Sequence, residues 1–215
     1  MENVESKVDV MEIHKPKPVH SWREFASEIG VIVIGILIAI GLEQTVEYVH
    51  HLDQLQSARE ELSLENNDNR QGTERNRRQI GEIEAKLARN MALLRASQTS
   101  HAPLAGRLDY SWGFRRPRDG AWQTAKQNGT LALMSHAELQ NYAHLYAVLG
   151  SFMDTLAAQN NQMDLASAIA SRSPDGALTP KDIDELITAT TVAQGRTITL
   201  KRMLEFELNA LNSVK

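Results

Sequence analysis

The sequence predicts an all-α protein with a single N-terminal transmembrane helix that continues into a long helix, followed by an extracytoplasmic helical bundle. Three observations lead to this fold class. The fourteen residues between Glu28 and Glu43 are all aliphatic or glycine. Aliphatic residues then recur at seven-residue intervals, as they do on one face of a helix. Aromatic residues make up only 5% of the chain, whereas good helix formers abound, so there is little material for a β-sandwich.

The composition narrows the classes of function. The 215 residues carry 23 basic and 27 acidic side chains and a net charge of −4, without the basic domain that nucleic-acid binders usually show. Nucleic acid is therefore not an expected partner. Cysteine is absent, which excludes thiol catalysis, zinc–thiolate sites and disulfides.

The apolar run is short for a membrane span, and its flanks extend it. Fourteen helical residues rise about 21 Å, against a hydrocarbon core of about 30 Å. Trp22 and Phe25 precede the run and Tyr48 follows it. The helix from Trp22 to Tyr48 is about 40 Å long, with rings near both ends, where aromatic belts lie in membrane proteins. We therefore predict a transmembrane anchor helix over residues 22–48.

A cleavable signal peptide is the main alternative for this run. Basic residues precede it, and Ala39-Ile40-Gly41 has the small residues of a cleavage site. Glu24 and Glu28, however, directly adjoin the apolar run, and the helical pattern continues without a break beyond Gly41. These features favour an uncleaved anchor.

The distribution of basic residues predicts the orientation of the anchor. Lys15, Lys17 and Arg23 precede the apolar run, and no Lys or Arg follows it before Arg59. By the positive-inside rule, residues 1–21 form a cytoplasmic tail and the C-terminal part lies outside the cytoplasm. Because residues 22–48 are expected to lie in a membrane, membrane lipid is an expected partner.

One sector of the anchor helix is a candidate helix-association face. Glu28, Gly35, Ala39 and Glu43 fall within about 80° of each other when successive residues turn by about 100°. Gly35 and Ala39 form a small-x-x-x-small pair, which lets a second helix approach closely in lipid. This face predicts a homo-oligomer or a membrane-protein partner. The alternative is a plain anchor whose two glutamates lie among the headgroups.

Residues 49–98 are predicted to form one long membrane-proximal helix. The stretch from Glu65 to Gln79 contains no apolar side chain and has an alternative interpretation as a solvated loop between two helices. The apolar positions before and after it are nevertheless in phase, which favours one helix. Several polar positions of the seam are asparagine, a residue that can fix register in a coiled coil. The seam runs through Leu52, Leu55, Arg59, Leu62, Asn66, Asn69, Thr73, Asn76, Ile80, Ile83, Leu87, Asn90 and Leu94.

The rest of the chain is predicted to be a connector over residues 99–121 and a helical bundle portion over 122–215. Pro103, Pro117 and several glycines interrupt the helical pattern in the connector. A helical spacing of apolar residues then runs from Leu139 to Met163. A last helix is expected to begin after Thr179, an N-cap residue followed by proline and, at the third position, a carboxylate.

The connector also carries a candidate contact for an anion or for lipid headgroups. Arg115, Arg116 and Arg118 lie beside Trp112 and Phe114. Arginine binds phosphate and carboxylate groups bidentately and stacks on aromatic rings. The alternative is a connector that its aromatic residues hold in place.

Two segments resemble a known family. "EIGVIVIGILIAIGLEQ" looks like the start of an uncharacterised bacterial family of short single-span membrane proteins, in which a similar segment runs directly into a long helix. "WQTAKQNGTLALMSHAELQNYAHLYAVL" resembles the same family's pattern of Trp, Gly, Leu and Tyr, here Trp122, Gly129, Leu139 and Tyr146. We expect these four residues to be structural. The resemblance implies a helical protein of the bacterial inner membrane and implies no established chemistry.

Neither a catalytic group nor a cofactor or metal site is expected. The sequence contains no H-E-x-x-H or G-x-S-x-G motif. His50 and His51 are adjacent, so on a helix they point about 100° apart. The sequence therefore favours a non-enzymatic periplasmic protein that acts by protein–protein contact, as a scaffold or accessory subunit. The alternative is an extracytoplasmic ligand-sensing bundle that signals through its single span.

Overall fold

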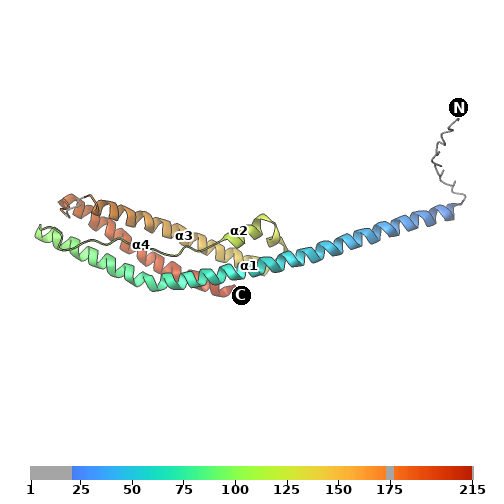
Figure 1. The fold of residues 1–215 in the computed structure, drawn as a ribbon, viewed down its shortest axis with the longest axis horizontal. Helices are drawn as coiled ribbons and strands as arrows, with labels where there is room; N and C mark the ends of the chain where they lie inside the picture. The colour runs from blue at the N-terminus through green and yellow to red at the C-terminus, as the bar shows by residue number, and fades with distance from the viewer. Residues whose placement is uncertain (1–20, 173–176, 215) are drawn as a thin grey trace, which may run out of the picture. The chain divides into compact units, whose positions relative to one another are not determined.

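The computed structural model describes residues 21–172 and 177–214, and within these ranges it contains helices and no strand (Figure 1). The predicted cytoplasmic tail, residues 1–21, lies outside the described residues except for its last position. By the contacts between its Cα atoms, the chain divides into two units, and the boundary follows His50. The elements are α1 (Trp22–Ser100), α2 (Gly120–Gln127), the 3-10 turn η1 (Thr130–Leu133), α3 (His136–Ala170) and α4 (Pro180–Ser213).

The first unit consists of the N-terminal part of α1. This helix is long and apolar enough to cross a membrane, and its most apolar window buries no residue against the rest of the chain. Its aliphatic and aromatic side chains are exposed along their whole length, from Trp22 to Val49. Exposed apolar surfaces of this size commonly mark sites of contact with a membrane or with another protein.

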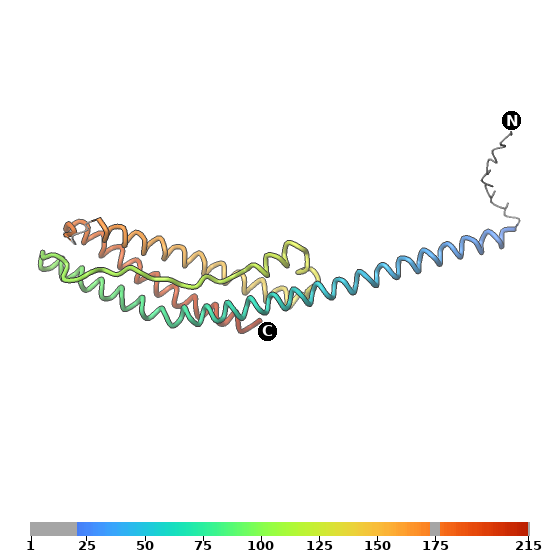
Figure 2. Tube along the Cα trace, in the orientation of Figure 1, coloured from blue at the N-terminus to red at the C-terminus, as the bar shows by residue number. Residues whose placement is uncertain are grey.

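The second unit, from His51 on, is a bundle of three long helices and an extended segment. α3 and α4 form a hairpin, and the part of α1 beyond His51 packs against both (Figure 2). The connector, residues 101–119, contains no helix and runs back along α1 until α2 begins at Gly120 (Figure 2). An extended segment thus occupies the position that a fourth helix holds in a four-helix bundle.

The polar stretch from Glu65 to Gln79 lies inside α1, which confirms the prediction of one unbroken helix. The solvated-loop alternative is wrong because this stretch also has a buried face. Asn66, Asn69, Thr73 and Asn76 are at most 5% exposed. Asn69 and Asn76 form hydrogen bonds to the connector, and Thr73 forms one to Glu207 of α4.

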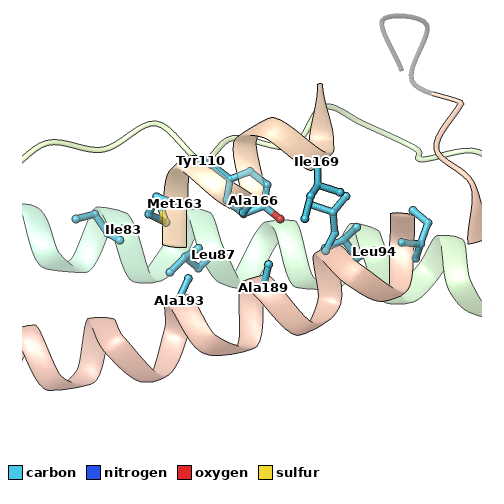
Figure 3. Packing of buried hydrophobic residues seen from close by; sticks show 11 residues of the cluster. Ile83, Leu87, Leu94, Tyr110, Met163, Ala166, Ile169, Ala189 and Ala193 are labelled. Atoms are coloured by element: carbon cyan, nitrogen blue, oxygen red, sulfur yellow. The ribbon is translucent and has the colours of Figure 1, made fainter. Parts of the chain in front are cut away.

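Apolar side chains from all three helices fill the bundle in three successive clusters. The first contains Leu62, Tyr142 and Leu211, and the second is centred on Phe152. The third joins the far end of α1 to the hairpin, and Tyr110 of the connector reaches into it (Figure 3). Every long helix thus contributes to every cluster.

The last helix, α4, begins with the predicted N-terminal chemistry, and α3 also has a side-chain cap. The Thr179 side chain accepts a hydrogen bond from the Asp182 N–H, and the Asp182 carboxylate accepts one from the Thr179 N–H. This is a capping box with Pro180 at the first turn, as predicted. Ser135 caps α3 in the same manner through the Glu138 N–H.

Candidate functional site

Three asparagines of α1 hold the connector by its backbone, and we call them the asparagine clips. In each clip the side-chain Nδ2 donates to a connector carbonyl, and Oδ1 accepts from the N–H of the same connector residue. The six donor–acceptor distances lie between 2.7 and 3.0 Å. The clipped pairs are Asn69 with Arg118, Asn76 with Arg115, and Asn90 with Asp109.

The spacing of the clips matches a helix to an extended chain. The seam positions 69, 76, 83 and 90 are seven residues apart on α1, a rise of about 10.5 Å for each step. The clipped connector residues are separated by multiples of three, and three residues of polyproline II or extended chain cover about 9 to 10 Å. Ile83 occupies the seam position where a fourth clip would stand, in register with Trp112. There the connector is held by apolar packing of Trp112 against the core.

These contacts correct the expected role of the seam asparagines. We expected them to fix the register of a helix against another helix, whereas the partner of Asn69, Asn76 and Asn90 is an extended segment of the same chain. A side-chain amide can match the N–H and C=O of one residue, so it pairs with backbone as readily as with a second side chain.

The three connector arginines are placed differently. Nη2 of Arg115 donates to both carboxylate oxygens of Asp68, at 2.6 and 2.7 Å, and Nε of Arg118 lies 3.4 Å from the same carboxylate. The stem of Arg115 crosses Gly72, where an added Cβ would lie 3.1 Å from Cδ of Arg115. Arg116 is exposed. Arg115 and Arg118 thus attach the connector to α1 through Asp68, and Arg116 is left on the surface.

The motif residues Trp122 and Tyr146 meet at a junction of α1, α2 and α3. Their rings stack with centroids 4.8 Å apart, and the ring of Tyr142 stacks at 6.4 Å from that of Trp122. The Tyr146 hydroxyl donates to Oε1 of Glu65 at 2.6 Å, while Oε2 of Glu65 accepts from the N–H of Ala121 at 2.9 Å. Burial and the neighbouring Glu65 carboxylate raise the pKa of Tyr146 far above its usual range. The hydroxyl is therefore a permanent donor.

The other two motif residues also have a structural position. Gly129 precedes η1 with a φ of 78°, a left-handed conformation that glycine adopts without strain. Leu139 packs beside the first core cluster. Gly129 therefore shapes the turn between α2 and α3, and Leu139 fastens the beginning of α3 to the core.

A groove of about 950 Å³ opens between the beginnings of the bundle parts of α1 and α3 and the end of α4. Arg59 and Glu138 form a bidentate ion pair on its wall, with two distances of 2.7 Å. This pair lowers the pKa of Glu138. Tyr142 also lines the groove and is 5% exposed. Burial raises the pKa of its hydroxyl.

The candidate helix-association face lies in the first unit. Glu28, Gly35, Ala39 and Glu43 are all exposed, and a Cβ added to Gly35 would have no atom of this chain within 4 Å. The face is therefore open to lipid or to another chain. In the part of the chain that the structure describes, no group of three His, Asp or Glu side chains is arranged for a metal ion.

Sequence reasoning missed Glu65, Asp68 and Glu207. The first two lie in a stretch that is polar on every side, so no pattern distinguishes the inward-facing acids from the others. Glu207 carried a usable signal, because it lies in the apolar stripe of α4 between Leu204 and Leu211. A single carboxylate at a core position points to a buried polar contact.

No protein-family model matches the chain, and neither a curated protein nor a solved structure matches it. The resemblance to a family of single-span membrane proteins therefore stays a prediction, and the function has to be inferred from the geometry of the chain itself.

Proposed function

We propose that this protein is anchored in the bacterial inner membrane by the N-terminal part of α1 and acts in the periplasm by protein–protein contact. In this proposal it is a scaffold or accessory subunit and not an enzyme. The observation that supports it is the apolar surface between Glu28 and Glu43, which the rest of the chain leaves exposed. Such a surface belongs in lipid, where it also offers Gly35 and Ala39 to another helix.

The construction of the bundle supports a scaffold. Several of its polar side chains join its own elements: the clips bind the connector, Glu65 joins three helices, and ion pairs link α1 to α3 and α4. Two side-chain bonds on one backbone residue hold an extended segment in a single register. A rigid bundle suits a protein that presents a surface to a partner.

The proposed topology predicts the activity of a reporter fusion. Alkaline phosphatase joined after Lys215 should be active, because this enzyme matures only outside the cytoplasm and the scarcity of basic residues after the span favours export of the C-terminal part. Activity is measured in whole cells against the amount of full-length fusion on an immunoblot. An inactive but stable full-length fusion would refute the orientation.

Self-association through the span is expected to depend on Gly35. Replacing Gly35 by isoleucine should reduce the cross-linked dimer in native membranes by about tenfold, which corresponds to about 1.4 kcal/mol, because the branched side chain occupies the space of a neighbouring backbone. The measurement compares cross-linked and monomeric protein at matched expression.

Gly30→Ile is the matched control for this experiment. Gly30 lies about 140° around the helix from Gly35 and also has no atom of this chain within 4 Å of an added Cβ. It tests the same change of residue in the same lipid on a different face. Equal cross-linking of the two variants, or a monomeric wild type, would leave the span as a plain anchor.

A ligand-sensing bundle is the second candidate, and the groove beside Tyr142 favours it. This groove combines a volume of about 950 Å³ with the side chain of Tyr142 and the Arg59–Glu138 ion pair, and ligand sites commonly join an apolar lining to a few placed polar groups. Native mass spectrometry after purification in mild detergent separates the two functions. A stoichiometric protein partner supports the scaffold, and a retained small molecule supports the sensor.

A further inference from the structure

Where the apolar run of α1 ends, three exposed aliphatic side chains continue along one side of the helix, and we call them the aliphatic stripe. Leu42, Val46 and Val49 are 64%, 71% and 59% exposed, and they follow one another at spacings of four and three residues. Most of the other positions from Glu43 to Gln54 are polar. The helix is therefore amphipathic here, whereas the preceding run is apolar on every side.

The aliphatic stripe continues the candidate helix-association face of the span. Stepping back by seven residues from Leu42 and Val46 gives Gly35 and Ala39, and the stripe and these two residues fall within about 80° of each other on an ideal helix. A Cβ added to Gly35 has no atom of this chain within 4 Å. The first buried residue of α1 is Leu55, which is not a member of this series. The chain itself therefore leaves the whole series uncovered.

The spacing of the series is that of a two-stranded coiled coil. In heptad terms, Ala39 and Val46 take the a position, while Gly35, Leu42 and Val49 take the d position. A β-branched residue at a together with Leu at d favours two parallel helices, and Val46 and Leu42 meet this description. The two small residues let the helices approach closely within the lipid.

Carboxylates bound the series at both ends. Glu28 takes the d position one heptad before Gly35, and Asp53 takes the a position one heptad after Val46. In a parallel pair of identical helices each carboxylate faces its own counterpart, and like charges in close contact repel. The apolar contact therefore lies between these two residues, and it reaches about 9 Å past Glu43, from six residues of helical rise.

We propose that a second copy of this chain covers the aliphatic stripe, so that two α1 helices remain paired beyond the membrane and separate at Asp53. A second copy fits because a chain anchored in the same membrane presents the same series, parallel and at the same depth. Every a and d residue then meets its own counterpart, as a two-fold axis requires. This inference rests on the proposed self-association of the span and extends it outside the membrane.

Disulfide cross-linking tests the pairing, and the chain suits this method because it contains no cysteine. Single cysteines are introduced into the full-length chain, and native membranes are treated with a mild oxidant. Two cysteines are bridged only when their Cα atoms lie within about 7 Å, which holds at the a and d positions of a parallel pair and not on the outer side. Val46→Cys and Val49→Cys should therefore give at least about fivefold more linked dimer than Gln44→Cys and Tyr48→Cys.

Tyr48→Cys is the matched control, because Tyr48 is apolar and 63% exposed but lies about 100° around the helix from Val49. Equal cross-linking at these two positions would overturn the inference, since it would mean contact without a preferred face. Ala39→Cys reports on the span alone. Dimer at Ala39 without dimer at Val46 and Val49 would overturn the inference and leave the span contact intact, whereas no dimer at any of the three would overturn both.

Discussion

Replacing Asn76 by alanine is expected to lower the free energy of unfolding of the bundle by about 2–4 kcal/mol. Asn76 is 1% exposed, and its side chain makes two hydrogen bonds of 2.8 Å with the backbone of Arg115. The substitution removes both bonds and leaves an N–H and a C=O of the connector facing a cavity. An unsatisfied buried donor or acceptor costs about 1–3 kcal/mol.

The measurement is chemical denaturation of the full-length chain, followed by tryptophan fluorescence, because Trp112 lies in the connector. Hydrogen exchange at the Arg115 amide gives a local readout and should accelerate in the variant. Asn209→Ala is the matched control: Asn209 is an exposed asparagine of α4, and its replacement should change stability by no more than about 0.5 kcal/mol. Equal effects of the two substitutions would contradict the role of the clips.

The free energy of unfolding is also expected to fall as the pH rises from about 4.5 to 7, by up to about 3 kcal/mol from Glu207 alone. The carboxyl ionises in the unfolded chain near 4.5, the ordinary value for glutamate, and in the folded chain only near 7. Between these values the unfolded chain has released its proton and the folded chain has not. The unfolded state is therefore favoured increasingly with pH, until the folded state ionises as well.

Glu207→Gln isolates this contribution, because glutamine keeps an acceptor for Thr73 and does not titrate. The difference in stability between the variant and the wild type should grow from pH 4.5 to 7 and then level off. Other carboxylates act in the opposite direction at lower pH. Hydrogen bonds from Ser111 lower the pKa of Asp109 to about 2, so its stabilisation is lost only below about pH 4. A constant difference between the two proteins across this range would refute the burial effect.

Helix content and helix ends were readable from the sequence because they depend on local chemistry. The capping box at Thr179 needs only residues that lie three apart along the chain. The phase of the seam across Glu65–Gln79 likewise predicted one helix, since a period of seven identifies a continuous buried face without reference to its neighbour. These predictions concern one helix at a time.

The sequence does not predict which segment packs against that buried face. The same seam pattern fits a second helix, a second copy or an extended segment, and only the packed chain shows that Asn69, Asn76 and Asn90 bind the connector. Arg115 and Arg118 illustrate the same limit. Arginines beside aromatic residues suggested a ligand contact. In the fold, Asp68, about 50 residues earlier in the chain, lies within reach of both arginines.

The sequence by itself determined that this protein has a helix apolar enough for a membrane, a long helix with one buried face, and a capped last helix. These are properties of neighbouring residues along the chain. Only the tertiary structure decided that an extended connector fills the fourth position of the bundle, that Glu65 joins three helices, and that Glu207 is buried against Thr73. Each of these depends on which groups meet after folding, and contacts between residues far apart in sequence leave no local pattern from which to predict them.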